Sequence, residues 1–385
     1  MKTLIIGAGP AGLAIAGRMR KIGLGFEMIE KTDKIAWSWT KHYDRLLLHT
    51  VKQLSHLPHL PFPDHYPLYV PRLELLKYYN DYATHFNIQP HFNIAATSMK
   101  KNGDKWIVQT NSEKHFEVDN VIIATGVNRV PNRPKWKGQD TFKGTIIHSR
   151  DYKNIAPFKD KKVLVIGMGN TGAEIALDLA ENDIEVSISV RSPISILPRD
   201  VNNRPVQLTA QKLAKLPFGI GDLLGTQIRK MLIGDLSKYG VPMSTIHPAV
   251  QLRKTGKTPV IDLGTVKYIK NGKIKVVGAI DQFTTTGILL KNSNKHHFDS
   301  IILATGYRPD LDDFVENISD MLDKYACPKQ AIGAEEHEGM FFIGFDNYKL
   351  GGILGTIFND SEVIVNSISK CCDKNKFIIK SSLKN

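Results

Sequence analysis

Cysteine is scarce in this sequence of 385 residues: only Cys327, Cys371 and Cys372 occur, and they form no C-x-x-C pair. A disulfide framework needs paired cysteines, and a dithiol redox centre needs two neighbouring thiols, so we exclude both. The histidines show no ligand spacing on a regular element, and we expect no metal site. The few cysteines are typical of a reducing compartment, which favours a cytoplasmic location.

Long apolar runs are also absent. A transmembrane helix needs about 20 consecutive apolar residues, and the sequence has no such run, so we expect no integral membrane segment. Acidic residues are fewer than basic ones, 38 against 51, which gives a formal net charge of +13. The lysines are scattered and not interleaved with aromatic residues, so we expect no nucleic-acid partner. A basic surface favours an anionic cofactor or an acidic protein partner.

A glycine-rich turn near the N-terminus is the first chemical signal. An apolar run over 2–6 leads into Gly7-Ala8-Gly9-Pro10-Ala11-Gly12, then into residues with helical spacing and an apolar run that ends at Glu30. The glycines permit a tight turn, a close approach to pyrophosphate and helix packing, and the acid suits ribose hydroxyls. The acid also disfavours a 2′-phosphate, so this pattern predicts FAD or NAD. The candidate cofactor residues are Gly7, Gly9, Pro10, Ala11, Gly12, Glu30 and Lys31.

A second fingerprint, Gly167-Met168-Gly169-Asn170-Thr171-Gly172, also follows an apolar run. Here the residue that we place at the position of the acid is Arg191. A guanidinium binds phosphate through paired hydrogen bonds, so the second site is predicted to prefer NADPH, unless this is only a surface arginine. The candidate residues are Gly167, Gly169, Asn170, Thr171, Gly172, Arg191 and Ser192.

Three further segments supply candidate cofactor contacts. The runs 121–126 and 301–306 both end in Ala-Thr-Gly, which predicts two strands that end against a cofactor, although an ordinary turn would look the same. The aromatic segment 35–63 either lines a flat flavin ring or packs in the core. A late glycine-rich helix start is expected to close over the first cofactor. The residues are Trp39, Thr125, Gly126, Ala304, Thr305, Gly306, Gly352 and Leu354.

The order of these signals predicts an α/β fold with two Rossmann-like dinucleotide-binding domains, the NADPH domain being inserted into the FAD domain. The predicted boundaries are 1–155 for the first part of the FAD domain, 156–300 for the NADPH domain, and 301–385 for the return and a C-terminal helix. One FAD and one NADPH imply hydride transfer to flavin. Three outcomes stay open: a monooxygenase, an electron transferase that reduces an acidic protein carrier, and a nucleotide-sensing binding protein.

The stretch between the fingerprints contains Phe142, Gly144, His148 and Tyr152 in the pattern F-x-G-x-x-x-H-x-x-x-Y. This resembles the identifying motif of class B flavin-dependent monooxygenases. Baeyer–Villiger monooxygenases typically carry tryptophan at the last position, so the tyrosine favours the flavin-containing monooxygenase branch. The segments 43–49, 197–199 and 256–265 are similar to the YUCCA-type branch, whose members decarboxylate indole-3-pyruvate oxidatively.

The resemblance implies a C4a-(hydro)peroxyflavin that oxygenates a small organic substrate with O₂. The reaction would be 2-oxo acid decarboxylation, Baeyer–Villiger-type oxygenation, or S- or N-oxygenation. Animal flavin-containing monooxygenases usually have asparagine where this sequence has His49, which makes broad amine oxygenation less expected. We predict that His49 tunes protonation and that Arg45 or Arg199 holds a substrate carboxylate, with salt bridges as the alternative. His148 is expected to anchor the crossing between the two sites. The sequence also allows a homodimer.

Overall fold

A computed structural model describes residues 1–213, 231–346 and 352–382. Its first parallel sheet has the order β2-β1-β6-β21. The strands and the helix that connects the first two are β1 (Thr3–Ile6), α1 (Pro10–Lys21), β2 (Glu27–Ile29), β6 (Asn120–Ile123) and β21 (Met340–Phe342). The short apolar runs of the sequence therefore form central strands, and β21 returns to this sheet from late in the chain.

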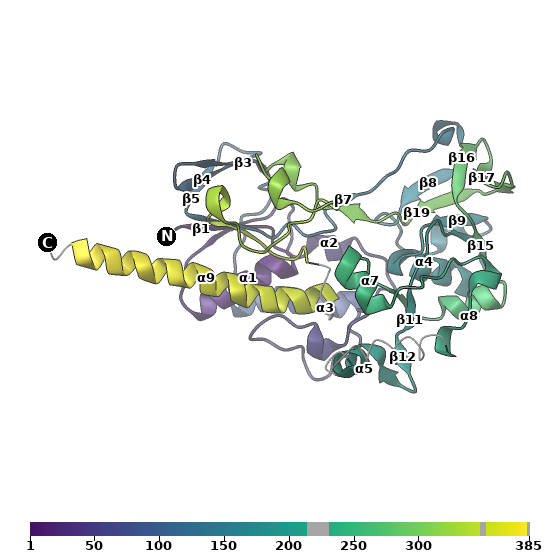
Figure 1. Cartoon of the computed structure of the whole chain (residues 1–385), viewed down its shortest axis with the longest axis horizontal. Helices are drawn as coiled ribbons and strands as arrows, with labels where there is room; N and C mark the ends of the chain where they lie inside the picture. The colour runs from purple at the N-terminus through teal and green to yellow at the C-terminus, as the bar shows by residue number, and fades with distance from the viewer. Residues whose placement is uncertain (214–230, 347–351, 383–385) are drawn as a thin grey trace.

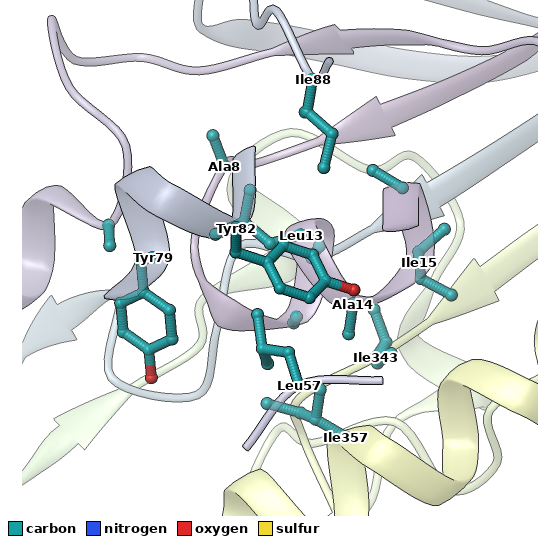
Figure 2. Packing of buried hydrophobic residues seen from close by; sticks show 14 of the residues in the cluster. Ala8, Leu13, Ala14, Ile15, Leu57, Tyr79, Tyr82, Ile88, Ile343 and Ile357 are labelled. Atoms are coloured by element: carbon teal, nitrogen blue, oxygen red, sulfur yellow. The ribbon is translucent and has the colours of Figure 1, made fainter. Parts of the chain in front are cut away.

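Both faces of the first sheet are covered, which explains why its strands are continuously apolar. Along β1, Ile5 faces a core formed with α1, α3 (Arg72–His85) and α9 (Gly352–Ser382). Leu4 and Ile6 face the opposite core, beneath the antiparallel sheet of β3 (Ala96–Asn102), β4 (Lys105–Thr110) and β5 (Phe116–Val118). Figure 2 shows the first of these cores, in which Tyr82 packs among aliphatic side chains.

A second parallel sheet has the order β15-β10-β9-β19-β8. Its elements are β8 (Thr145–His148), β9 (Val163–Ile166), α4 (Asn170–Glu181), β10 (Val186–Ser189), β15 (Ile274–Val277) and β19 (Ser300–Leu303). The fingerprint strand β9 lies between β10 and β19, as β1 lies between β2 and β6. The two sheets thus repeat one arrangement of strand, glycine turn, helix and neighbouring strands.

Smaller elements surround these two sheets. They are α2 (Trp37–Thr40), β11 (Ile196–Pro198), β12 (Asp200–Val201), β13 (Arg204–Pro205), α5 (Val206–Leu213), α7 (Pro248–Thr255), β14 (Val260–Asp262), α8 (Thr265–Lys270), β16 (Ile280–Thr284), β17 (Gly287–Leu290) and β18 (Lys295–His297). Strands β16, β17 and β18 form an antiparallel sheet, and β11 pairs with β14. None of these strands is part of either parallel sheet.

Two short strands lie where the chain crosses between the sheets. β7 (Val130–Pro131) follows β6 on the outward path, β20 (Tyr307–Arg308) follows β19 on the return, and the two pair as an antiparallel ribbon. The predicted boundaries differ from this path: β8 falls before residue 155, and β19 spans the boundary at 300, yet both belong to the second sheet. The sequence predicts a connection at this position, because β8 is an edge strand of only four residues.

The C-terminal helix α9 lies along α1, and its final part extends past the body of the molecule (Figure 1). It packs through Leu354, Ile357, Ile364, Val365 and Ile368, which are buried in the first core. Among the described helices, none combines the length and the apolar character needed to cross a bilayer.

Candidate cofactor and active site

A cavity of about 260 Å³ lies at the carboxyl edge of the first sheet. The strands β1, β6 and β21 are parallel, so the residues that follow them meet at one edge, where parallel sheets bind ligands. The cavity is lined by ten of the residues predicted from sequence: Gly7, Gly9, Pro10, Ala11, Glu30, Lys31, Trp39, Thr125, Gly126 and Leu354. Segments that are distant in sequence therefore converge at this cavity.

The glycines of the first fingerprint have distinct steric roles. Gly7 has φ +109°, and a Cβ on it would lie 2.7 Å from the Ala124 carbonyl oxygen. A Cβ on Gly12 would lie 2.0 Å from the Gly7 carbonyl oxygen, so any side chain there would force α1 away from β1. A Cβ on Gly9 would meet no atom within 4 Å, which leaves open space at the helix N-terminus. This combination forms a tight turn with a free approach to the start of the helix.

Glu30 is fixed in place by the turn that it faces. Its Oε2 accepts a hydrogen bond from the Ala8 backbone N–H at 2.9 Å, and its Oε1 accepts from the N–H and the hydroxyl of Thr32 at 3.0 and 2.8 Å. A carboxylate can accept about four hydrogen bonds. Glu30 therefore keeps acceptor capacity for ribose hydroxyls while its orientation is set by backbone groups.

The cavity suits a flavin dinucleotide in charge and hydrogen bonding. Thr125 Oγ1 is buried there and has no hydrogen-bond partner among the described residues, which is costly unless a ligand supplies one. Lys31, Arg129 and Arg150 line the cavity. Burial, followed by the charge of Arg129, lowers the pKa of Lys31. An anionic pyrophosphate would relieve this crowding of positive charge, so the residues present fit the predicted cofactor.

The backbone geometry at the glycines of the second fingerprint closely matches that of the first. Gly167 has φ +104°, with a Cβ position 2.5 Å from the Ala304 carbonyl oxygen, and the Cβ of Gly172 would lie 2.0 Å from the Gly167 carbonyl oxygen. The space at Gly169 is again open within 4 Å. Asn170 Oδ1 accepts a hydrogen bond from the Ile261 N–H at 2.7 Å, which ties the start of α4 to β14. The Ala-Thr-Gly turns are therefore equivalent supports beneath the two fingerprints.

The position of the ribose-binding acid differs from the sequence prediction. Gly7 N–H donates to Ile29 and Gly167 N–H donates to Ser189, so the residue equivalent to Glu30 is Val190 and not Arg191. We correct the alignment by one residue: Arg191 corresponds to Lys31. Val190 is buried, whereas Arg191 and Ser192 are exposed beyond the strand end. The second site thus lacks the carboxylate and has an exposed guanidinium next to it.

The motif between the fingerprints holds the return crossing through His148, which is completely buried at the end of β8. Its Nε2 lies 3.1 Å from the Gly306 carbonyl oxygen, and its Nδ1 accepts from the Arg150 N–H at 3.1 Å. Burial lowers the pKa of His148, so the neutral ring donates through Nε2 and accepts through Nδ1. The ring also meets Tyr307 edge-on at 5.1 Å. His148 therefore fixes the return crossing at the second Ala-Thr-Gly turn.

The other motif residues are structural supports. A Cβ on Gly144 would lie 2.4 Å from the Asp299 carbonyl oxygen and 2.5 Å from Phe142, so this strand start requires glycine. Tyr152 is 1% exposed and donates to Asp178 on α4 at 2.6 Å. The motif therefore locks β8 and its following turn against the second unit.

The loop that contains the predicted catalytic residues contacts one face of α4. His49 Nε2 lies 3.1 Å from Glu174 Oε2, and the Tyr43 hydroxyl donates to the same oxygen at 2.7 Å. Neither His49 nor Arg45 lines the cavity described above. The loop does reach it through His42, which lines the cavity and contacts the Tyr43 ring.

Both arginines considered for substrate binding form ion pairs. Arg45 Nη1 lies 3.1 Å from Asp178 and 2.7 Å from Glu181. Arg199 Nε lies 2.8 Å from Asp200, and its guanidinium stacks over Tyr69. These contacts favour the salt-bridge alternative for both arginines.

In the described part of the chain, one group of side chains has the spacing of metal ligands: Asp320, Glu336 and His337, whose ligand atoms lie within 4.8 Å of one another. His337 Nε2 is 3.2 Å from both carboxylate oxygens of Asp320, which is an ordinary ion pair. None of the three lines the cavity. We therefore assign no metal to them.

Sequence reasoning missed several residues that line the cavity: Lys41, His42, Arg129, Arg150, Tyr307, Phe314 and Gly344. Gly344 was detectable, because it follows an apolar run as the other turn glycines do. Burial, with the charge of Lys153, lowers the pKa of His42 to about 4, so this ring is neutral near pH 7. No sequence pattern predicts that Arg129 and Arg150 line the cavity, because both reach it only from the segments that cross between the sheets.

Comparisons with known proteins agree with this geometry. A family model described as flavin-binding monooxygenase-like matches residues 1–362. The chain is 35% identical over 359 residues to "Probable indole-3-pyruvate monooxygenase YUCCA9" of Arabidopsis thaliana, and the match covers 91% of this chain and 85% of that protein. It is 32% identical over 359 residues to "Indole-3-pyruvate monooxygenase YUCCA1" of Oryza sativa subsp. japonica, with 92% and 88% covered.

Solved structures share the fold at lower identity. A flavin-containing monooxygenase from Stenotrophomonas maltophilia has a TM-score of 0.74 and 19% identity, and the match covers 96% of this chain and 98% of that chain. A crystal structure of OTEMO in complex with FAD and NADP has a TM-score of 0.72 and 19% identity, with 97% and 86% covered. These matches confirm a mixed α/β fold over nearly the whole chain.

Proposed function

Because the chain belongs to the flavin-binding monooxygenase-like family, we propose that it is an NADPH-dependent FAD monooxygenase that oxygenates a small 2-oxo acid with loss of CO₂. Membership of the family confirms the resemblance inferred from the motif around His148, and with it the assignment as a flavin-dependent monooxygenase. The substrate class is our proposal, and the curated relatives named as indole-3-pyruvate monooxygenases support it. A cytoplasmic location, supported by the scarcity of cysteine, is part of the same proposal.

The observation that carries the proposal is the pair of equivalent glycine turns, one of which has a carboxylate beside it while the other has a guanidinium nearby. One turn faces Glu30, and the other lies beside the end of β10, where Val190 and the exposed Arg191 follow. This difference supports FAD in the first unit and NADPH in the second, inserted, Rossmann-like unit. When bound, NADPH supplies a hydride, and the flavin accepts it and delivers the electrons to O₂.

The residues of this chain bind and orient the two cofactors and shield the first site from water. Gly7 and Gly9 let the pyrophosphate approach the helix start, Glu30 accepts from ribose hydroxyls, and Thr125 Oγ1 gains the hydrogen bond that it lacks. Arg191 and Ser192 hold the 2′-phosphate, and Ala304, Thr305 and Gly306 support the second turn. Trp39 and Leu354 line the cavity and, with the helix start at Gly352, close the first site against water, while His49 holds or releases a proton on the loop that reaches the cavity through His42.

Product analysis with isotope-labelled oxygen tests this function. FAD-loaded protein, NADPH and ¹⁸O₂ should convert a 2-oxo acid, RCOCOOH, and O₂ into RCOOH, CO₂ and water, with NADPH oxidised to NADP⁺. We expect one ¹⁸O atom in each carboxylic acid formed and about one product for each NADPH consumed. Ketones, amines and sulfides serve as competing substrate classes, and preferred oxygenation of one of these would revise the substrate.

The electron-transferase alternative makes a different prediction. It requires NADPH oxidation that reduces a protein carrier, or only hydrogen peroxide, without labelled organic product. That result with every substrate class would contradict a monooxygenase. Gly25→Ala is a suitable control variant, because a Cβ at Gly25 would meet no atom within 4 Å and the residue lies outside both sites.

A further inference from the structure

The geometry points to Glu174 as a positioning residue that fixes the tautomer of His49. The inference rests on the proposed function, in which His49 exchanges a proton. Glu174 lies on α4, two residues after the last glycine of the second fingerprint, and only 3% of its surface is exposed. A buried carboxylate is costly unless it is paired or hydrogen-bonded. The groups that satisfy it are therefore informative.

Glu174 Oε2 is shared by two side chains of the loop from the first unit. Tyr43 donates its hydroxyl at 2.7 Å, and His49 Nε2 lies at 3.1 Å. Burial, and then the Glu174 charge, raise the pKa of Tyr43 well above its ordinary value, so Tyr43 remains a donor. Among the described residues, His49 is the one basic side chain within ion-pair distance of Glu174.

This contact determines which nitrogen of His49 carries the proton. An ionised carboxylate only accepts hydrogen bonds, so Nε2 must be the protonated nitrogen that faces Glu174. In the neutral ring, Nδ1 then keeps its lone pair and is the atom that can take up a proton. The His49 side chain is 17% exposed, so a proton can still reach it.

The other charged groups around this contact come from three elements. On α4, Asp178 and Glu181 follow Glu174 at helical spacing, and Arg45 from the loop pairs with both. Tyr307 on β20 acts on Tyr43 from the cavity side. Because Arg45 already offsets the outer carboxylates, Glu174 is left as the charge that acts on His49.

The loop also connects this contact to the first site. His42 lines the cavity at one end of the loop, and the Thr50 side chain lies 2.9 Å from where a Cβ on Gly352 would be. Leu354, just after that glycine, lines the cavity as well. The contact therefore holds a loop of the first unit against the helix that begins at the second fingerprint. Movement of α4 would change the environment of His49.

The position of the proton on the His49 ring tests the inference without relying on turnover. The full-length FAD-loaded protein, labelled with ¹⁵N-histidine, is studied by NMR at one fixed pH, and His49→Asn identifies the signals. In the wild type the two ring nitrogens should have clearly different ¹⁵N chemical shifts, with the proton on Nε2. Glu174→Gln should move the proton to Nδ1 in a large part of the molecules, because an amide can donate to Nε2 as well as accept from it. Glu174→Asp and Tyr43→Phe both keep a carboxylate for His49 and should retain most of the wild-type pattern.

Glu181→Gln is the matched control, since Glu181 lies on the same face of α4 but is exposed and pairs with Arg45. The ¹⁵N chemical shifts of His49 in this variant should match the wild type. FAD content and Tm verify that each variant folds. An unchanged His49 tautomer in Glu174→Gln would overturn the inference.

The amount of product formed per NADPH consumed is then measured on the same variants. It should fall in Glu174→Gln, with little change in the Kd of NADPH. A changed tautomer with an unchanged product yield would overturn the positioning role. Absence of oxygenated product in the wild type would instead refute the proposed function, and the NMR spectra would still decide whether Glu174 fixes the tautomer of His49.

Discussion

At the residue scale, one position separates the two nucleotide sites. Glu30 and Val190 occupy equivalent places after equivalent strands, and a carboxylate in one unit is replaced by a buried apolar side chain in the other. Arg191 follows directly and is exposed. The removal of a repulsive acid and the addition of a guanidinium both favour a ribose that carries a 2′-phosphate.

Arg191→Ala should therefore weaken NADPH far more than NADH. A hydrogen bond to a charged group contributes about 1.5–3 kcal/mol, so we expect the KM for NADPH to rise at least about tenfold. The KM for NADH should change little, because NADH has no 2′-phosphate. Steady-state kinetics with both coenzymes measures this difference. Equal weakening of the two would show that Arg191 does not contact the phosphate.

Residue pairings were the part of the site that the sequence could not predict. His49 was singled out from its loop, but its partner Glu174 lies 125 residues away, and Tyr43 is 131 residues from the same carboxylate. No local pattern contains such a pair, because it depends on how the second unit docks on the first. The same docking turned Arg45 from a candidate ligand into an ion-paired residue.

At the element scale, the unit of strand, glycine turn and helix was predictable because local physics determines it. An apolar strand that leads into a turn has few alternative structures when the turn needs positive φ values, which glycine adopts most readily. The edge strand β8 was missed because four residues with mixed exposure resemble a connection. The order of strands in each sheet, and hence the cavity, depends on pairing between distant segments.

The tight turn makes a prediction about the first helix. Gly12→Ala places a Cβ 2.0 Å from the Gly7 carbonyl oxygen, so α1 must move away from β1. Overpacking of this kind costs about 1–3 kcal/mol, and we expect a lower Tm and loss of bound FAD. Gly25→Ala is the matched control because its Cβ meets no atom within 4 Å, and it should retain both. Retention of FAD and Tm by Gly12→Ala would contradict this account of the turn.

At the scale of the whole molecule, the two units are connected by the ribbon of β7 and β20 and by the contacts around it. Thr305 Oγ1 donates to the Asn132 carbonyl at 2.5 Å, and Asn132 Nδ2 donates to the Thr305 carbonyl at 3.2 Å. His148 adds the link to Gly306. These bonds join the outward crossing to the return, so the ribbon sets the relation between the two glycine turns. Hydride transfer depends on that relation, because a misplacement of the reactants by about 1 Å can slow a reaction about 100-fold.

His148→Ala should therefore impair the transfer between cofactors more than the binding of either one. The variant loses the bond to the Gly306 carbonyl and the acceptor for the Arg150 N–H, while both fingerprints remain intact. We expect the rate of flavin reduction by NADPH in the absence of O₂ to fall about tenfold or more, because small misplacements of reactants are costly. Stopped-flow absorbance measures that rate, and separate titrations give the Kd of each cofactor. His115→Ala, at an exposed histidine outside the crossing ribbon and the cavity, is the control and should match the wild type. If the Kd values of His148→Ala worsened as much as its rate, His148 would be a binding residue and the ribbon would not be what aligns the two sites.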